Sequence, residues 1–266
     1  MSLAATSAEA LEPVRADPSR SGLLLDIDGT LAPIVRHADD AHVQEATRTL
    51  LIGAARRYRL VACVTGRRAS SGRQIVAIGT IAYSGNHGIE LLRPGATQAQ
   101  IDPEVAAWAE KVRDFAEAQA PTDLQRLRIR LEDKDTIFAF HWRGAPDEER
   151  AHHALLEVAE RAQAAGLATH WGRKVLEVRP PVAIGKGHAV RALLRDSGVR
   201  VALYAGDDRT DLDAFAALRE LVREGALDQA VCVAVASPEG PAELVQEADL
   251  VVEGTDGTRA VLGALL

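Results

Sequence analysis

The most informative stretch of this sequence is LLLDIDGTL, residues 23–31. It opens with a continuous apolar run, which is typical of a strand buried on both faces of a parallel sheet. Two carboxylates, Asp26 and Asp28, follow at the point where that strand ends, and Gly29 with Thr30 allows the backbone to turn sharply. Together these features predict a buried strand that carries a pair of acids to the edge of a sheet.

Short apolar runs alternate with amphipathic stretches in the rest of the chain, which predicts a doubly wound α/β parallel-sheet (Rossmann-like) core. Ligands of such folds gather beyond the carboxyl ends of the strands. The further expected strands cover 60–64, 201–205, 231–236 and 250–252, and the expected helices cover 43–57, 67–78, 186–197, 209–224, 239–247 and 256–265.

The middle third of the chain breaks this alternation. A helical pattern over 104–119 is followed by period-2 stretches near 127–131 and 138–142, a helix at about 147–165, and a hairpin that turns at Gly172. This mixture predicts an inserted α+β domain. We therefore expect a flexible tail over 1–20, a core domain over 21–94 and 179–266, and the inserted domain over 95–178.

Composition limits the classes of function. Of the 266 residues, 47% are hydrophobic and 26% are charged, as expected for a folded protein. The formal net charge of −7 offers no basic field for nucleic acid, and no apolar run approaches the roughly 20 residues that cross a bilayer. The two cysteines, Cys63 and Cys232, lie in apolar runs and are expected to be buried thiols. We expect a cytoplasmic protein with no nucleic-acid or membrane partner.

Three further motifs also follow or precede elements of the predicted core. The stretch GDDRTD, residues 206–211, brings Asp207, Asp208 and Asp211 to the end of a strand, where oxygen ligands suit Mg²⁺. Asp207 is the expected metal ligand, and the other two are expected to act around it or through water. Helix capping is the alternative role for these acids.

The remaining two motifs supply a hydroxyl and a cation. Thr65, in VTGRR at residues 64–68, follows a strand and can donate a hydrogen bond to a phosphoryl oxygen. Lys186, in GKG at residues 185–187, can balance the charge of a nucleophile and of a phosphoryl group. With them, one acid of the first motif can attack phosphorus while the other transfers protons. The histidines show no zinc-ligand spacing.

The order DIDGTL, VTGR, GKG, GDDRTD resembles the four motifs of the haloacid dehalogenase-like phosphatase superfamily, over about residues 22–215. The resemblance implies that Asp26 is the nucleophile and Asp28 the general acid and base, with Thr65 and Lys186 on the phosphate. It also implies that residues 95–178 form a type 2 cap. The implied Mg²⁺ site consists of Asp26, the backbone carbonyl of Asp28 and Asp207, with Asp208 and Asp211 close by.

Four shorter segments are similar to those of trehalose-6-phosphate phosphatases: GNHGIE at 85–90, LEDK at 131–134, HWR at 141–143 and GRKVLEVRP at 172–180. Glu132 and Lys134 lie two apart on an expected strand and so would share a face, as would Arg173 and Glu177. Acceptors and donors on one surface suit sugar hydroxyls. The substrate-binding residues implied by the resemblance are Arg67, Asn86, His87, Glu132, Lys134, Arg173 and Glu177.

The resemblance implies an enzyme that hydrolyses trehalose 6-phosphate through an aspartyl-phosphate intermediate, in functional pairing with a trehalose-phosphate synthase. Arg173 stands where the family has lysine, and Thr65 where it usually has serine, so the substrate is less determined than the reaction. One alternative is a phosphatase for mannosyl- or glucosyl-glycerate phosphate or for sucrose phosphate. The other is a non-catalytic sugar-phosphate sensor that regulates a synthase.

Overall fold

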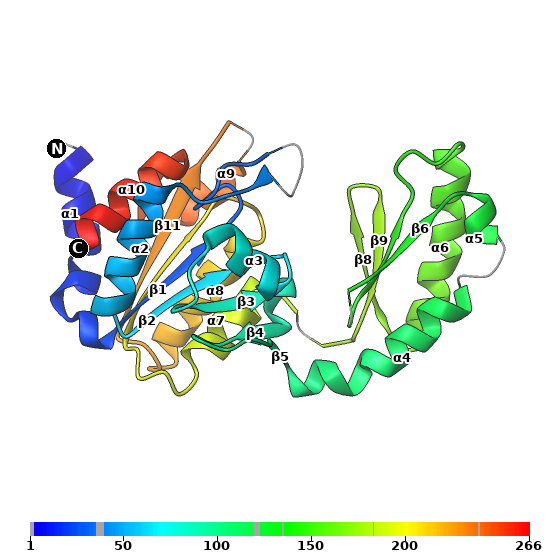
Figure 1. The fold of residues 1–266 in the computed structure, drawn as a ribbon, viewed down its shortest axis with the longest axis horizontal. Coiled ribbons are helices and arrows are strands. Elements are labelled where there is room, and N and C mark those ends of the chain that lie inside the picture. Colours follow the sequence, from blue (N-terminus) through cyan, green and yellow to red (C-terminus); the bar gives the residue numbers. More distant parts are fainter. Residues whose placement is uncertain (1–2, 36–39, 120–122, 135, 183, 239) are drawn as a thin grey trace. The chain divides into compact units, whose positions relative to one another are not determined.

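The computed structural model describes residues 3–35, 40–119, 123–134, 136–182, 184–238 and 240–266 (Figure 1). Contacts divide the chain into two compact units. The first combines Met1–Gln100 with Ile184–Leu266, and the second is Ile101–Ala183. A discontinuous first unit is what an insertion into a single α/β domain produces.

An eight-stranded sheet forms the centre of the first unit, in the order β12-β11-β10-β1-β2-β3-β4-β5. The pairs from β12 to β3 are parallel, and β4 runs antiparallel to β3. The expected parallel α/β sheet is therefore confirmed. Its strands are β1 (Ser21–Asp26), β2 (Leu60–Val64), β3 (Ala82–Gly85), β4 (Glu90–Leu92), β5 (Gln100–Ile101), β10 (Val201–Gly206), β11 (Gln229–Ala236) and β12 (Leu250–Glu253).

Helices cover both faces of this sheet, as Figure 1 shows. One hydrophobic cluster joins Leu23 and Leu25 of β1 to the first group of helices, and a second joins Leu24 to the other group. Burial on both faces explains why β1 is apolar without alternation. The first group is α1 (Leu3–Ala16), α2 (Glu45–Arg57), α3 (Ala69–Val76) and α10 (Gly254–Leu265); the second is α7 (Lys186–Leu194), α8 (Asp211–Arg223) and α9 (Ala242–Glu247).

The register of the central strands determines where the polar motifs meet. Asp26 pairs with Val64 of β2, and Leu25 pairs with Ala205 of β10. All three strands run in the same direction, so the residues that follow them reach the same edge of the sheet. That edge receives the segments that begin at Asp26, Thr65 and Asp207.

The N-terminal segment differs from the flexible tail expected over residues 1–20. Residues Leu3–Ala16 form α1, and a short 3₁₀ helix, η1, follows at Pro18–Arg20. Leu11 and Val14 are fully buried and belong to the first hydrophobic cluster. This segment has no long apolar run, but two buried side chains dock the helix on the sheet.

The second unit is an antiparallel sheet with helices on one face. The sheet has the order β6-β7-β9-β8, and its apolar side chains, such as Phe140 and Leu176, pack with α4 and α6. Asp147 caps α6 by accepting a hydrogen bond from the Arg150 amide at 2.9 Å. The elements are α4 (Pro103–Gln119), α5 (Asp123–Arg126), β6 (Arg130–Asp133), β7 (Phe138–His141), α6 (Glu148–Ala164), β8 (Ala168–Gly172) and β9 (Val175–Arg179).

Two details of this unit differ from the sequence prediction. The strand expected near 127–131 begins only at Arg130, because Asp123–Arg126 forms a helical turn and Arg128 takes a left-handed conformation, φ 56°. The hairpin does not turn at Gly172, which still pairs with Val175 in the ladder. The turn lies at residues 173–174, where Lys174 has φ 62°.

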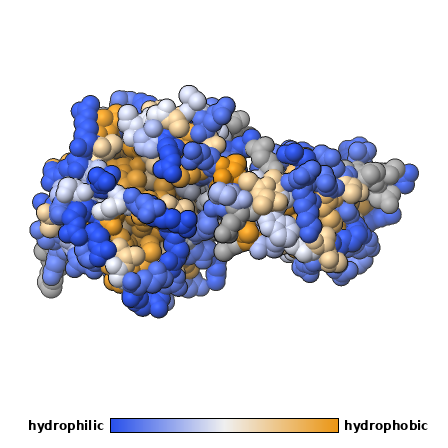
Figure 2. Space-filling model, turned by 90° about the horizontal axis from the view of Figure 1, so that it is seen from below, coloured by the Kyte–Doolittle hydropathy of each residue, from blue (hydrophilic) through white to orange (hydrophobic). Residues whose placement is uncertain are grey.

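Hydrophilic residues predominate on the face of the molecule seen in Figure 2, with smaller hydrophobic areas between them. Among the described residues, no helix combines the length and the apolar character that crossing a bilayer requires. Cys63 and Cys232 are both buried free thiols, as the sequence predicted.

Candidate active site

Asp26 is the last residue of β1 and is buried, with 4% of its surface exposed. The loop that follows turns back on itself, with the Gly29 amide bound to the Ala32 carbonyl at 2.7 Å. Gly29 has φ 87°, and a Cβ there would lie 2.0 Å from a carboxylate oxygen of Asp207. Glycine is required at this position because the chain after β1 passes directly against the motif that follows β10.

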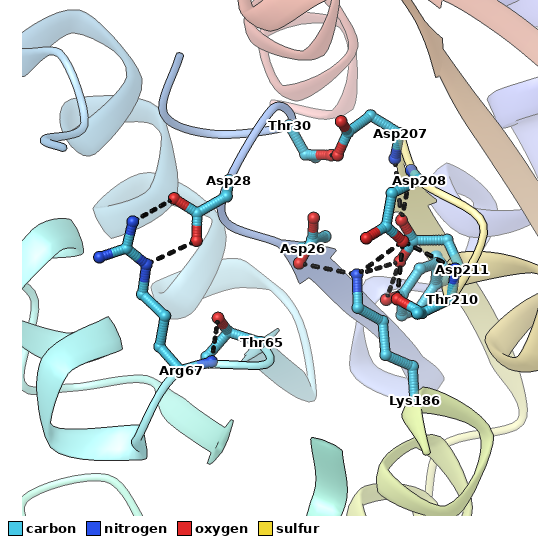
Figure 3. A network of polar contacts seen from close by, with 11 residues as sticks. Asp26, Asp28, Thr30, Thr65, Arg67, Lys186, Asp207, Asp208, Thr210 and Asp211 are labelled. Carbon is cyan, nitrogen blue, oxygen red and sulfur yellow. Dashed lines mark hydrogen bonds and ion pairs between the residues drawn. The ribbon is translucent and has the colours of Figure 1, made fainter. Parts of the chain in front are cut away.

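The strand β10 delivers Asp207 to Asp26 from a distant part of the sequence. Thr30 Oγ1 donates a hydrogen bond to Asp207 Oδ1 at 3.2 Å, which ties the two motifs together (Figure 3). Carboxylate oxygens of Asp26, Asp207 and Asp211 all lie within 4.8 Å of one another, and all three residues are buried. The acids that the sequence places at one sheet edge are thus brought into a single cluster.

Lys186 carries positive charge into this cluster from the first residue of α7. Its Nζ lies 3.0 Å from Asp26 Oδ1, 2.7 Å from Asp211 Oδ1 and 3.4 Å from Asp208 Oδ1. Only 2% of the lysine surface is exposed. Burial by itself would lower the pKa of Lys186, but the charges of Asp26, Asp211 and Asp208 raise it instead, so the ammonium stays protonated.

Asp211 accepts hydrogen bonds from several of the residues in this cluster and so fixes their positions. Its Oδ1 accepts hydrogen bonds from Lys186 Nζ and from the Tyr204 hydroxyl, the latter at 2.6 Å. Its Oδ2 accepts from the backbone amides of Asp207 and Asp208, both at 2.9 Å. Each oxygen therefore already has two partners, and Asp211 serves to orient Lys186 and the Asp207 backbone.

The carboxylates of the cluster repel one another. Burial raises the pKa of Asp26 well above its usual value; Lys186 opposes the change, and Asp211 and Asp207 add to it. Burial likewise raises the pKa of Asp211 to about 6. Burial also raises the pKa of Asp207, against a hydrogen bond that it shares with Asp26. Two carboxylates in such contact need a shared proton or a cation between them.

A cluster of buried carboxylates with too few cations beside it is suited to bind a hard divalent cation. Asp26 and Asp207 offer carboxylate oxygens at the same point, and Mg²⁺ favours a few carboxylates together with water. Asp211 belongs to the same group by distance, but its oxygens already accept four hydrogen bonds. Asp208 is engaged with Thr210 at 2.6 Å and 2.8 Å. The residues best suited to hold the metal are therefore Asp26 and Asp207.

Asp28 lies in the loop that follows Asp26 and has a different partner. Arg67 donates to both of its oxygens, from Nε and from Nη2, each at 2.7 Å. The Arg67 backbone amide in turn donates to Thr65 Oγ1 at 3.1 Å, so Thr65, Arg67 and Asp28 form one connected group (Figure 3). Arg67, which the resemblance suggested as a substrate ligand, here holds the expected acid and base.

The segment 85–90 lies against this group rather than opening to solvent. Asn86 is buried, and its side-chain amide donates to Glu90 Oε1 at 2.6 Å. The His87 amide donates to the Thr65 carbonyl at 3.3 Å. Asn86, expected to bind substrate, thus has its amide nitrogen committed inside the protein.

The second unit presents charged residues on the face of its sheet opposite the apolar cluster. The register places Glu132, Ala139, Glu177 and His170 in one row across the four strands. Glu177 pairs with Lys134 at 2.9 Å and closely with Arg179. Burial acts to raise the pKa of Glu177, but Arg179 and Lys134 outweigh it and lower that pKa to about 2.

Two other predicted residues of this unit, Glu132 and Arg173, differ from what strand alternation alone suggests. Glu132 pairs with His141 at 2.7 Å rather than with Lys134, which lies just beyond the end of β6. Arg173 lies in the turn, outside both strands, so strand alternation does not place its side chain on the face of Glu177. The lysine beside it, Lys174, pairs with Glu148 at 2.6 Å.

Three residues of the site in the first unit escaped sequence reasoning. Thr30, Tyr204 and Glu90 all touch the predicted motifs through hydrogen bonds between distant parts of the chain or across tight loops. Their position in the sequence could have identified them, because each lies within a few residues of a strand end that carries an acid or a loop glycine.

Comparison with known proteins gives a consistent family. Residues 24–247 match the sequence model of the trehalose-phosphatase family. The chain is 31% identical over 223 residues to a protein of Arabidopsis thaliana named probable trehalose-phosphate phosphatase D, covering 74% of this chain and 56% of that one. It is 31% identical over 216 residues to trehalose 6-phosphate phosphatase RA3 of Zea mays, covering 75% and 59%. The chain spans little more than half the length of these curated relatives.

Solved structures agree on the fold. The C-terminal domain of a C. albicans trehalose-6-phosphate phosphatase superposes with a TM-score of 0.70 at 21% identity, covering 97% of this chain and 96% of that one. The C-terminal domain of a Candida albicans trehalose synthase regulatory protein gives 0.67 at 14% identity, covering 96% and 97%. With the family model matching most of its length, this chain belongs to the trehalose-phosphatase family.

Proposed function

We propose that this chain is a Mg²⁺-dependent phosphatase that hydrolyses trehalose 6-phosphate to trehalose and phosphate, with Asp26 as nucleophile. The observation that carries the proposal is the buried Asp26 carboxylate, held 3.0 Å from the Lys186 ammonium and clustered with Asp207. Membership of the trehalose-phosphatase family and the names of the curated relatives support the substrate class.

The proposed reaction has two displacements at phosphorus. An oxygen of Asp26 attacks the phosphorus, the bond to the sugar oxygen breaks, and Asp28 gives that oxygen a proton. Asp28 then takes a proton from water, which attacks the aspartyl phosphate and releases inorganic phosphate. Arg67 occupies one lone pair on each oxygen of Asp28, which leaves a second lone pair on each oxygen to carry the proton.

The other groups stabilise charge during these steps. Lys186 offsets the negative charge of Asp26 and of the phosphoryl oxygens, and the Thr65 hydroxyl would donate a hydrogen bond to one of these oxygens. A magnesium ion held by Asp26 and Asp207 would neutralise part of the charge on the phosphate and the carboxylates. The charged sheet face of the second unit, with Glu132, Lys134 and Glu177, offers donors and acceptors for sugar hydroxyls.

A regulatory role is the second candidate, since the fold is shared with a domain of a synthase regulatory protein. It corresponds to a chain that binds a sugar phosphate and pairs with a synthase without turnover. We favour the enzyme because Asp26 lies 3.0 Å from the Lys186 ammonium, and Asp28, two residues further along, is held by Arg67.

The test is phosphate release by the purified chain with Mg²⁺ from trehalose 6-phosphate, sucrose 6-phosphate, glucose 6-phosphate and glucosylglycerate phosphate. We expect trehalose 6-phosphate to be preferred, and Asp26→Asn to lose turnover while its circular dichroism stays that of the wild type. Equal catalytic efficiency on glucose 6-phosphate and trehalose 6-phosphate would contradict the proposed preference for trehalose 6-phosphate. Unchanged turnover by Asp26→Asn would contradict the aspartyl-phosphate mechanism.

A further inference from the structure

The loop between β3 and β4 has an unusual backbone. Asn86, His87 and Gly88 take φ values of 47°, 57° and 99° in succession, a left-handed conformation that non-glycine residues rarely adopt. Such a run persists only where the surroundings hold it in place. The neighbouring chain is close, because a Cβ on Gly85 would lie 2.1 Å from the Ala69 amide nitrogen.

Glu90 supplies part of that restraint from inside the protein. With 5% of its surface exposed, it accepts the Ala69 backbone amide on Oε2 at 2.7 Å and the Asn86 side-chain amide on Oε1 at 2.6 Å. Ala69 is the first residue of α3, two positions after Arg67. The carboxylate thus joins the start of α3 to the left-handed loop.

The loop in turn contacts both sides of the active site. The backbone amide of Asn86 donates to the Arg67 carbonyl at 2.7 Å, and the backbone amide of His87 donates to the Thr65 carbonyl at 3.3 Å. On the other side, the His87 carbonyl accepts the Gly185 amide at 2.8 Å, and Gly185 is the residue before Lys186. A Cβ on Gly88 would come within 2.9 Å of the Ala189 amide nitrogen, so the loop lies directly against the first turns of α7.

We propose that Glu90, through its hydrogen bond to Asn86, is a positioning residue that sets the placement of Arg67, and with it Asp28, relative to Lys186. This rests on the proposed phosphatase function, because it assigns Glu90 and Asn86 to the geometry of that reaction and not to substrate contact. Arg67 fixes Asp28 by two hydrogen bonds, and Lys186 fixes Asp26. The loop is the piece of chain that touches the backbone on both sides.

The chemistry at Glu90 explains why a carboxylate is suited to the position. Two N–H donors, from Ala69 and Asn86, converge on it, and a carboxylate accepts at both oxygens. A glutamine accepts at one end only. Exchanging the partners' roles, with aspartate at 86 and glutamine at 90, restores one donor and one acceptor between the two side chains. Aspartate also tolerates the left-handed conformation of position 86.

The experiment is a double-mutant cycle with Asn86→Asp, Glu90→Gln and both together, assayed with saturating Mg²⁺ on trehalose 6-phosphate. Asn86→Asp sets two buried carboxylates against each other, and we expect kcat to fall about 100-fold with KM within about threefold of the wild type, as for a small misplacement of catalytic groups. Glu90→Gln alone is expected to lower kcat about 10-fold. The double variant should recover to within about fivefold of the wild-type kcat.

Asp249→Asn is the matched control. Asp249 likewise accepts one backbone amide, that of Cys232 at 2.7 Å, and one side-chain donor, Arg219 Nη2 at 2.7 Å, but it touches neither the loop nor the catalytic groups. We expect it to lower the unfolding midpoint with kcat unchanged.

Three outcomes separate the possibilities. Additive losses in the cycle, with no rescue, would overturn the positioning role of the hydrogen bond between Glu90 and Asn86. An unchanged kcat in Asn86→Asp, with a stability loss like that of Asp249→Asn, would make the pair purely structural. A wild-type chain that releases no phosphate from any sugar phosphate would overturn the proposed function itself.

Discussion

The two sheets of this protein treat buried charge in opposite ways. At the edge of the parallel sheet, Asp26 and Asp207 are buried together, and the pKa of each carboxyl is raised. On the polar face of the antiparallel sheet, Glu177 lies between Lys134 and Arg179, and its pKa is lowered to about 2. The first arrangement has too little positive charge for its acids, whereas the acid of the second has two cations beside it.

Because of this difference, the two regions are suited to different kinds of ligand. The cluster at the parallel sheet gains stability from a cation, since its carboxylates repel one another in a setting that excludes water. The Glu177 carboxylate, which already lies between two cations, needs no added cation. A sugar that binds there has to exchange its hydroxyl hydrogen bonds for parts of existing ion pairs, which favours geometric selectivity over affinity.

Among the substitutions that test this difference between the two sheets, we expect the largest effect at Asp207. Asp207→Asn removes a metal-binding carboxylate, and we expect kcat to fall about 100-fold or more and the Mg²⁺ concentration for half-maximal activity to rise. Asp208→Asn is the matched variant, because Asp208 is half exposed and bound to Thr210. It should change the Mg²⁺ response much less. Equal responses of the two variants in a Mg²⁺ titration would contradict the assignment, as would full activity after chelation with EDTA.

Lys186 is the next most sensitive position. Lys186→Gln leaves Asp26 and Asp211 without the ammonium that lies between them, so we expect kcat to fall about 100-fold. We also expect the free energy of unfolding to fall by about 3 kcal/mol, as for a broken buried ion pair. Lys174→Gln, which removes an exposed pair with Glu148, should change neither quantity measurably. Steady-state kinetics and urea unfolding of the two variants distinguish these cases.

The two regions also differ in how far sequence reasoning reached. Asp26 and Asp207 were predictable because each ends or follows a buried strand, and the direction of parallel strands carries both to one edge. Lys186 was predictable from its place at the start of the helix α7. Tyr204 was not, because its role depends on Asp211 turning back toward β10. The docking of α1 by Leu11 and Val14 was likewise hidden, since burial of two side chains leaves little trace in a short segment.

In the antiparallel sheet, strand alternation was an incomplete guide. It placed Glu132 and Lys134 on one face, and Lys134, although it lies past the end of β6, does reach that face by pairing with Glu177 in the row of Glu132. It also linked Arg173 with Glu177, although Arg173 belongs to the hairpin turn. Alternation predicts faces only inside a strand, and strand ends depend on turn geometry, here the left-handed Lys174.

Glu177 tests the role of the second sheet. Glu177→Gln keeps the volume but weakens the hold on Lys134 and Arg179, so we expect KM for trehalose 6-phosphate to rise about 10-fold, as for one charged hydrogen bond. Hydrolysis of p-nitrophenyl phosphate, which has no sugar, should stay unchanged. Glu157→Gln, in an exposed pair on α6, is the control. A parallel loss on both substrates would place Glu177 outside sugar binding.

A further expected effect concerns stability at acid pH. The folded pKa of Glu177, about 2, lies below its ordinary 4.5, so its contribution is complete above about pH 4.5 and is lost as the pH falls toward 2. The stability difference between wild type and Glu177→Gln should therefore shrink by about 2 kcal/mol between pH 6 and pH 3. All three tryptophans, Trp108, Trp142 and Trp171, belong to the second unit, so the fluorescence change in urea reports on that unit alone. A difference that is constant over this range would mean that the ion pairs with Lys134 and Arg179 do not hold the Glu177 carboxylate in solution.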